Sequence, residues 1–546
     1  MAINLSAEQK TIRQLFYNTD QFVIPEFQRT YSWGYEQCDQ LYRDIVNAAA
    51  KGEDYFLGNV VMARSDENKT QPQIVDGQQR IISLWILLKI LSVYVESIDL
   101  EDTVLKLKAW KKTEDAQPKI ISCVGEQKDG DQIAELLTKD RIYFANRLLQ
   151  VLDKAQKKIR QDKCMSNIEY AALLFYYNIS QADITDELRE NLTMFLLDNV
   201  SLLPIEMGGR QLNEARERAL MIFETINNRG MDLVDADIFK SRLFSNAMSF
   251  NQEKEFVNKW LFMTERVNAL GTTIDEVFRC YYHIIRGEKG ITSAEMKLRD
   301  FFLKDKASPL TFLNHDVFMD NLGKVINALE RYTAFDQETT EVAGWMQVLN
   351  AYTNNFPKYA VIAYLYKYPD PDEKDFLQYI KSIARYVYYT GSTTTVKFGV
   401  YSIIQRMAQE LPREDYYQPN LSFSGLSTSS RLISGYSLIA YYQSGNETIK
   451  QPVIEKLIYE SEVDRLTGDS NFKGFTNDDV YTLGNTFILR SSLRGKSIKD
   501  RLAILEKTPK VFYLNCVGKF DSQEYNHRQN EIQDTLLKFF RGNERD

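Results

Sequence analysis

Residues 73–80 carry the sequence Gln73-Ile74-Val75-Asp76-Gly77-Gln78-Gln79-Arg80. The β-branched residues at 74 and 75 are typical of the end of a strand. Asp76-Gly77 is typical of a tight turn, because glycine tolerates backbone angles that other residues resist. The turn leads into a dense apolar run, which consists of Ile81, Ile82, Leu84, Trp85, Leu87, Leu88, Ile90 and Leu91. Because this run has no continuous polar face, it predicts a helix that is buried on most sides.

Polar side chains gather at the start of this predicted helix. Free backbone N–H groups and the helix dipole favour an anion at such a position. Arg80 could bind a phosphate through two parallel hydrogen bonds, and Asp76 could hold a metal ion or a water. The same residues also fit a simpler arrangement, in which Asp76 caps the turn and Arg80 forms a salt bridge.

A second polar motif lies upstream and reads Ile24-Pro25-Glu26-Phe27-Gln28-Arg29-Thr30-Tyr31-Ser32-Trp33. The proline cannot occupy a central strand position, so a strand predicted over residues 21–27 must pass into a loop here. This loop combines donors with flat rings, which suits holding a phosphate and stacking a base. The residues concerned are Gln28, Arg29, Tyr31 and Trp33. In the alternative arrangement, which the residues alone favour, both rings belong to the core and the arginine caps a helix.

A third polar motif follows a helix predicted from about Asn213. It reads Phe223-Glu224-Thr225-Ile226-Asn227-Asn228-Arg229-Gly230. The glycine should end the helix, and Asp235 or Asp237 should begin the next one, which carries Lys240. Side chains of Asn227, Arg229 and Lys240 could complete a phosphate site at this turn. Simple capping of a helix hairpin is the alternative.

Composition limits the class of protein. A chain of 546 residues is too long for one core, so two to four domains are expected. The net charge of −8 means that any contact with nucleic acid must come from local patches. The five cysteines form no CxxC pair, which argues against zinc ribbons and fits a reducing cytoplasm. With neither a signal peptide nor an apolar run of membrane-spanning length, a cytoplasmic protein without membrane contact is expected.

The second half of the chain divides into two parts. Residues 251–443 show mainly helical spacing, with tyrosines and phenylalanines at positions expected for a core. Near the C-terminus a basic stretch has a local excess of positive charge, and it is the best candidate surface for DNA. Its leading residues are Arg490, Arg494, Lys496, Lys499 and Arg501. A solvated helix face is the commoner explanation of such a stretch.

Taken together and in this order, the three N-terminal motifs resemble the GmrSD-type family of modification-dependent restriction and phage-defence factors. The resemblance covers residues 1–245 and implies a ParB/sulfiredoxin-like domain that binds or hydrolyses a nucleoside triphosphate. It implies that Asp76, Gln79 and Arg80 are catalytic, with Mg²⁺ held at Asp76. It also implies nucleotide contacts from Gln28, Arg29, Tyr31, Trp33, Gly77, Gln78, Asn227, Arg229 and Lys240.

A weaker resemblance concerns the C-terminal nuclease half of the family. There an Ile-Glu-His-Ile-type segment precedes Leu-Gly-Asn-Leu in a ββα-metal nuclease, and Leu483-Gly484-Asn485 matches the second segment. The first segment aligns best with Val463-Asp464-Arg465-Leu466, which puts Arg465 in place of the catalytic histidine, and Arg494 falls near a further expected asparagine. Arginine stays protonated and cannot activate water, so this HNH-like domain is expected to be inactive unless His527 substitutes.

The sequence therefore predicts a predominantly helical α+β protein with three domains. These are a small α/β nucleotide-binding domain with a helical insertion (1–245), a helical domain (246–445) and a degenerate HNH-like domain (446–546). The leading functional hypothesis is a defence protein that binds and hydrolyses a nucleoside triphosphate and acts on DNA, including modified phage DNA. The alternatives are a non-catalytic DNA- or nucleotide-sensing subunit, and a nuclease that acts through the N-terminal site. Cleavage would then be delegated to a partner effector protein or to the N-terminal domain itself, and a homo-oligomer is a further expectation.

Overall fold

The computed structural model describes residues 5–17, 21–66, 71–95, 118–124, 128–153, 156, 158–161, 165–181, 183–227, 235–304, 308–390, 396–409, 430–466, 475–507 and 521–541. They belong to two compact units, Met1–Leu261 with Asn314–Asp316, and Phe262–Leu313 with Val317–Asp546. The helical middle and the C-terminal part, which the sequence treated as separate domains, fall together in the second unit. Within the described parts of the chain, no helix is both long enough and apolar enough to span a membrane.

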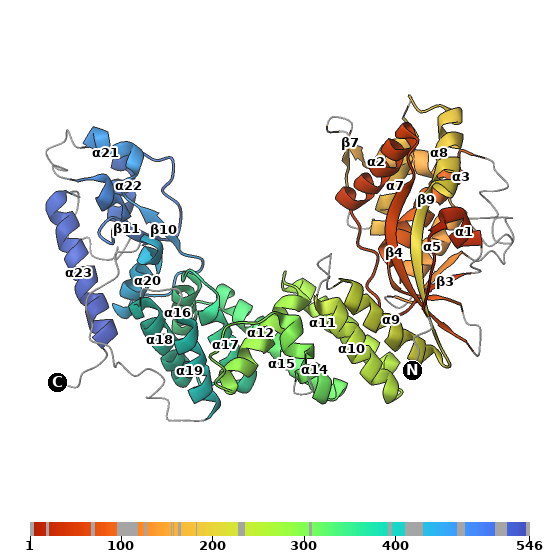
Figure 1. The fold of residues 1–546 in the computed structure, drawn as a ribbon. Coiled ribbons are helices and arrows are strands. Elements are labelled where there is room, and N and C mark those ends of the chain that lie inside the picture. The colour runs from red at the N-terminus through yellow and green to blue at the C-terminus, as the bar shows by residue number, and fades with distance from the viewer. Residues whose placement is uncertain are drawn as a thin grey trace. The chain divides into compact units, whose positions relative to one another are not determined.

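A mixed seven-stranded sheet organises the first unit (Figure 1). Its strands are β1 (Leu5–Ala7), β2 (Lys10–Thr11), β3 (Phe22–Ile24), β4 (Tyr55–Ser65), β5 (Gln73–Asp76), β6 (Ile120–Ser122) and β9 (Val200–Gly209). The order is β1-β9-β4-β5-β3-β6, with β2 also paired to β9. Strand β5 runs antiparallel to β4 and parallel to β3. The first two sequence motifs therefore meet, because β3 leads into the loop at 25–33 and β5 leads into the turn at 76–77.

Helices complete the first unit. They are α1 (Ile12–Tyr17), α2 (Tyr35–Lys51), α3 (Gln78–Ser92), α5 (Lys128–Thr138), α6 (Arg141–Val151), α7 (Asn167–Ile179), α8 (Asp186–Asp198), α9 (Leu212–Asn227) and α10 (Asp235–Ser249). A short hairpin pairs β7 (Leu152–Asp153) with β8 (Lys158–Ile159). The prediction of a buried helix after Gly77 is confirmed, because almost every residue of α3 is buried and the helix packs against α7.

The second unit is mainly helical, so the predicted α+β fold class with a helical majority is confirmed (Figure 1). Its helices are α12 (Ile274–Glu288), α13 (Leu298–Leu303), α14 (Pro309–Phe312), α15 (His315–Ala334), α16 (Glu341–Asn350), α17 (Phe356–Lys367), α18 (Glu373–Thr390), α19 (Val396–Ala408), α20 (Ile433–Gln443), α21 (Glu460–Leu466), α22 (Ile498–Lys507) and α23 (Ser522–Arg541). Helix α11 (Glu253–Ala269) runs from the first unit into the second.

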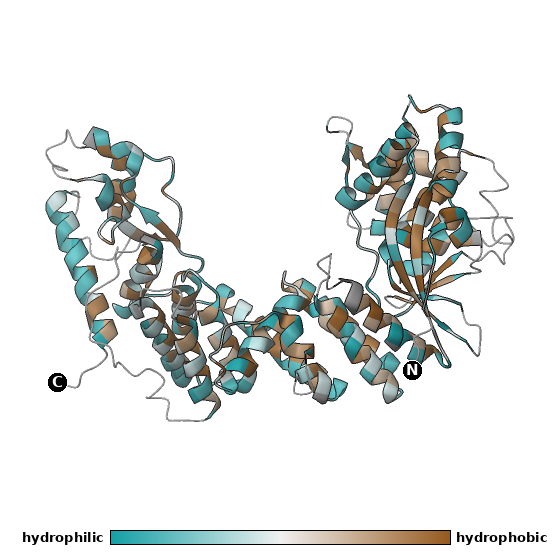
Figure 2. Cartoon of the chain, viewed as in Figure 1, coloured by the Kyte–Doolittle hydropathy of each residue, from teal (hydrophilic) through white to brown (hydrophobic). Residues whose placement is uncertain are grey.

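The C-terminal part of the second unit has a small core of its own. Strands β10 (Val453–Lys456) and β11 (Thr486–Leu489) pair antiparallel, and a cluster that includes Leu457, Phe487 and Leu505 packs beside them. Helix α23 is hydrophilic over most of its first turns and carries hydrophobic residues toward its end (Figure 2). There Phe539 stacks on Trp345 of α16 at 5.1 Å between ring centroids, which joins this part to the helical layer.

Candidate functional site

The turn between β5 and α3 can be made only by glycine. Gly77 has a φ of +90°, a backbone conformation that side chains rarely adopt. A Cβ atom at this position would lie 3.0 Å from Cγ2 of Val60 and 3.2 Å from the backbone oxygen of Asn59. The close approach of the turn to β4 fixes Asp76, which ends β5 opposite Val61. Gly77 therefore positions the site by its backbone.

Arg80 lies in the first turn of α3 and reaches back to β4. Its Nη1 donates a hydrogen bond to the backbone oxygen of Asn59 at 2.5 Å, beside Gly58, where the pairing of β4 with β9 is irregular. Burial raises the pKa of the Asp76 carboxyl, and the positive charges of Arg80 and Arg29 oppose that rise. The structure thus brings two cations to one partly desolvated carboxylate at the start of α3.

Three glutamines hold the loop that carries Arg29. The amide nitrogen of Gln28 donates to the backbone oxygen of Val75 at 2.8 Å, and that of Gln78 donates to the backbone oxygen of Arg29 at 3.0 Å. The amide of Gln79 accepts from the backbone nitrogen of residue 32 at 2.8 Å and donates to the backbone oxygen of residue 30 at 3.2 Å. These bonds clamp the loop onto the β5–α3 turn.

The clamp bears on the role of Gln79. Its side chain is 6% exposed, and both the oxygen and the nitrogen of its amide bond the loop backbone. This arrangement fits the expected role of Gln28 and Gln79 in orientation. The catalytic role of Gln79 stays a prediction. In Gln78 the oxygen is buried without a hydrogen-bond partner among the described residues, whereas its nitrogen serves the clamp.

Helix α10 contributes an ion pair to the cluster. Nε of Arg29 lies 3.9 Å from Oδ2 of Asp237, and Nζ of Lys240 donates to the backbone oxygen of Gln28 at 2.9 Å. Burial lowers the pKa of Lys240 to about 8, opposed by the charge of Asp237. Burial also raises the pKa of Asp237, while Arg29 and Lys240 act in the opposite direction. Sequence reasoning treated Asp237 only as a helix start, although its spacing of three from Lys240 places both on one helix face.

The two aromatic residues of the loop do not form a stacking platform together. The ring of Tyr31 is 3% exposed, and its hydroxyl lies 2.7 Å from Oγ of Ser83 inside the core. Its backbone nitrogen donates to the buried carboxylate of Asp129 at 2.7 Å. The expected contact of Tyr31 with a base is therefore corrected, since its ring belongs to the core. Trp33 is partly buried and also packs against this core.

Two predicted contacts lie outside what the structure describes. Arg229 lies outside the described residues, as does the side chain of Asn227 at the end of α9, so their predicted roles stay predictions. Within the described residues, no group of three or more histidine, cysteine, aspartate or glutamate side chains could hold a metal ion. Mg²⁺ often needs only one or two carboxylates when substrate phosphates supply the rest. The expected binding of Mg²⁺ at Asp76 therefore stays a prediction.

The C-terminal strands bear on one sequence alignment. The strand that pairs with β11 is β10, with Glu455 opposite Phe487 and Lys456 opposite Thr486. The sequence from the second residue of β10 onward is Ile454-Glu455-Lys456-Leu457. This segment also fits the Ile-Glu-His-Ile pattern, with lysine at the histidine position. The earlier alignment placed Arg465 there, but that residue lies in helix α21. Lys456 is thus a second candidate for the expected histidine position beside Arg465, and a lysine also cannot act as a neutral imidazole.

Asn485 and Arg501 both have structural partners in this region. The amide of Asn485 is fully buried and bonds the backbone of Ile458 through its oxygen and its nitrogen, both at 2.9 Å. Arg501 is 1% exposed and donates to the Glu462 carboxylate at 2.6 Å, so its predicted contact with DNA is corrected. The other four cations of the predicted patch are exposed, namely Arg490, Arg494, Lys496 and Lys499.

The fold and the site together define a class of protein, an α+β domain with a charged cluster at the mouth of a buried helix. Residues 12–244 match the family described as GmrSD restriction endonuclease, N-terminal domain. The resemblance to the GmrSD-type family is thus confirmed for residues 12–244, the range that contains all three N-terminal motifs, and this match points to a restriction or phage-defence protein. No curated protein matches the sequence.

Proposed function

We propose that the first unit binds a nucleoside triphosphate at the start of α3. The observation that carries this proposal is the convergence of Arg29 and Arg80 on Asp76, at a helix N-terminus that no side chain caps among the described residues. Backbone N–H groups and two guanidinium groups are the donors that phosphate oxygens prefer. Arg29 is the exposed cation and would contact the distal phosphates, with Arg80 beside it.

Hydrolysis of the triphosphate would follow from the same arrangement. A water attacks the terminal phosphorus, the new oxygen–phosphorus bond forms as the bond to the leaving diphosphate breaks, and the proton of the water passes to Asp76. Burial raises the pKa of Asp76, which makes its carboxylate a better proton acceptor. Mg²⁺ would be held by phosphate oxygens together with Asp76, and it would supply charge neutralisation. The glutamine clamp would keep Arg29 in place while negative charge shifts to the leaving group.

Binding is tested by titrating ATP and GTP into the purified full chain in the presence of MgCl₂. Arg29→Ala should weaken binding about tenfold to a hundredfold, because each charge-assisted contact to phosphate contributes roughly 1.5–3 kcal/mol. Arg43→Ala is the matched control, since Arg43 is exposed on α2 and pairs only with Asp39 among the described residues. Equal affinities of wild type, Arg29→Ala and Arg43→Ala would refute the phosphate role of Arg29.

Turnover separates hydrolysis from sensing. Release of inorganic phosphate, measured with and without DNA, is expected from wild type and should be lost in Asp76→Asn. Binding that is retained without any release would instead favour a regulatory subunit that senses the nucleotide. In that case cleavage would belong to a partner effector protein or to a second copy of the chain.

We further propose that DNA is the target, as the family description implies, and that the C-terminal region contacts it without cutting it. Either Arg465 or Lys456 occupies the histidine position, and the amide of Asn485 is used by the backbone around it, which supports an inactive nuclease. Purified protein should show no metal-dependent nicking. Reversing Arg494 and Lys496 to glutamate should lower DNA affinity and its salt dependence. Nicking that His527→Ala abolishes would contradict the proposal.

A further inference from the structure

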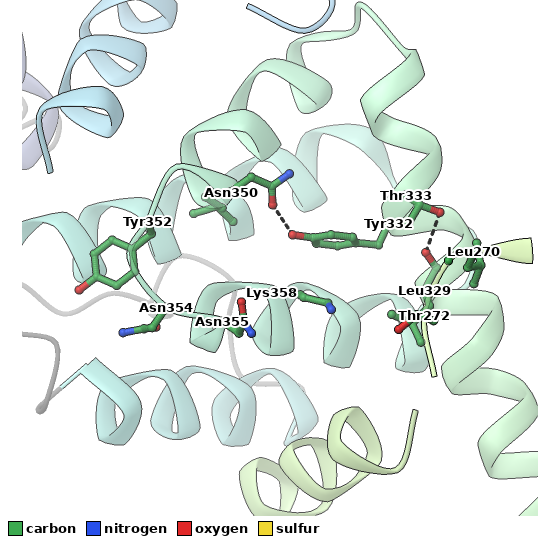
Figure 3. Close-up of a pocket in the computed structure, with 12 residues that line it drawn as sticks. Leu270, Thr272, Leu329, Tyr332, Thr333, Asn350, Tyr352, Asn354, Asn355 and Lys358 are labelled. Carbon is green, nitrogen blue, oxygen red and sulfur yellow. Dashed lines mark hydrogen bonds between the residues drawn. The ribbon is translucent and has the colours of Figure 1, made fainter. Parts of the chain in front are cut away.

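A cavity of about 420 Å³ lies within the second unit, apart from the cluster at α3 (Figure 3). Its walls come from the connection between α11 and α12, the C-terminal ends of α15 and α16, and the start of α17. Its volume is in the range of pockets that hold small ligands. No motif of the sequence falls on it, and the proposed triphosphate site does not use it.

The lining is polar but carries almost no net charge. Lys358 is the one lysine, arginine, aspartate or glutamate in it, and its Nζ donates to Oε1 of Glu276 at 2.8 Å. The polar lining is otherwise made of amides and hydroxyls, which include Asn350, Asn354, Asn355 and Thr272. The amide oxygen of Asn350 already accepts from Tyr332, and that of Asn354 accepts from the backbone nitrogen of Phe356 at 3.1 Å, so these two amides contribute mainly N–H donors. Helices both end and begin at the cavity, so their dipoles also give no strong preference for an anion.

An aromatic ring crosses this polar cavity. The hydroxyl of Tyr332 donates to Oδ1 of Asn350, which fixes the ring in one orientation. Figure 3 shows the ring edge-on, with Asn355 and Lys358 on the side facing one of its flat surfaces. Burial raises the pKa of Tyr332, so the phenol stays neutral. Leu270, Leu329 and Leu349 add apolar surface to the lining. A fixed ring beside apolar surface and amides favours a flat heteroaromatic ligand with polar edges.

We propose that this cavity binds a nucleoside, with its base against the ring of Tyr332 and its base edge bonded by asparagine amides. Asparagine N–H groups can donate to the acceptor atoms of a base edge. A paired lysine and opposing helix ends disfavour a phosphate group, so the ligand is a nucleoside rather than a nucleotide. Two sources share this chemistry, a free nucleoside and an unstacked base of single-stranded DNA.

The full chain is titrated by calorimetry with adenosine, guanosine, cytidine and thymidine, each at up to millimolar concentration. At least one should bind, and Tyr332→Leu should weaken that binding about fivefold to a hundredfold, the range expected for loss of base stacking. Asn355→Ala, at an exposed lining position, should also weaken it and guards against a folding defect in the first variant. Asn268→Ala is the matched control, because Asn268 is exposed on α11 but does not line the cavity.

Two further comparisons decide the source and the independence of the site. Competition by a homopolymeric oligonucleotide of the preferred base would assign the cavity to DNA, and its failure to compete would assign it to the free nucleoside. Arg29→Ala should leave nucleoside binding unchanged, which separates this site from the proposed triphosphate site. The proposal is wrong if no nucleoside binds, if both cavity variants bind like wild type, or if ribose alone competes as well as the nucleoside.

Discussion

Replacing Gly77 by alanine should separate the two costs that this turn imposes on any other residue. The first cost is conformational, because a φ of +90° lies where a Cβ atom clashes with the backbone, at roughly 1–2 kcal/mol. The second is steric, since the new Cβ would lie 3.0 Å from Val60 and 3.2 Å from the oxygen of Asn59. Overpacking of this kind adds about 1–3 kcal/mol. Gly77→Ala should therefore destabilise the first unit by roughly 2–5 kcal/mol.

Gly52 provides a control that carries only the first cost. It ends α2 with a φ of +67°, and a Cβ atom there would meet nothing within 4 Å. Gly52→Ala should thus cost about 1–2 kcal/mol, leaving a difference of roughly 1–3 kcal/mol that reports the contact of the turn with β4.

The assay is native-state hydrogen exchange of the backbone amides in β4 and β5. A chain with two compact units need not unfold in one step, and exchange measures the stability of the first unit directly. Triphosphate binding by Gly77→Ala is measured in parallel and should fall with the displacement of Asp76. The reasoning fails if both glycine variants lose equal protection, because the close approach to Val60 would then carry no energy.

Three other perturbations test the environment of single side chains. Gln79→Ala should speed exchange of the amides in residues 28–33 and cost about 1–3 kcal/mol, whereas unchanged protection would show that the clamp does not hold the loop. The stability of wild type relative to Lys240→Met should rise as pH increases from about 8 to 10.5, because over that range the unfolded lysine still binds a proton that the folded lysine has released. The full gain in the free energy of unfolding is about 3 kcal/mol. A stability difference that does not change with pH would contradict this prediction. Arg501→Ala should lower the free energy of unfolding by about 3–5 kcal/mol, because it leaves the Glu462 carboxylate unpaired. Arg494→Ala is the comparison, since the Arg494 side chain is 86% exposed, and it should change the free energy of unfolding by less than about 0.5 kcal/mol. Equal losses in the two variants would contradict the buried ion pair.

The strand–turn–helix at the centre of the first unit could be predicted because its signals are local. Two β-branched residues, a glycine and a dense apolar run decide it within twenty residues, and the structure places β5, Gly77 and α3 accordingly. The sequence also predicted a helix from about Asn213 and a further helix from Asp235 or Asp237, and the structure has helices over 212–227 and from Asp235. The order of the strands could not be predicted, because no local sequence pattern shows which segments the sheet order β4-β5-β3 brings together.

The roles of individual site residues depended on such distant partners. From the sequence, Tyr31 is a candidate for stacking on a base. In the structure its hydroxyl forms a hydrogen bond with Ser83, fifty-two positions later, and this contact holds the ring in the core. The sequence also could not show that the amide of Gln79 forms hydrogen bonds with the loop backbone through both its oxygen and its nitrogen. Arg465 was aligned with a histidine position by residue type, and only the pairing of β10 with β11 pointed to Lys456 as a second candidate. Charge and spacing thus located the cluster, whereas burial and pairing decided what each member does.

The division of labour inside the motif follows from the chemistry of its side chains. An amide carries both a donor and an acceptor, so a glutamine can bond a neighbouring backbone without adding charge, whereas a guanidinium only donates. Gln78 and Gln79 accordingly fasten the loop, and the loop in turn holds Arg29 between Asp76 and Asp237. Lys240 ties α10 to the same loop through the oxygen of residue 28. Arg29 is thus an exposed cation on a loop that is held in place. A phosphate that binds there would compete with the two carboxylates for the guanidinium group. Because this group is already oriented, binding would cost little further side-chain entropy.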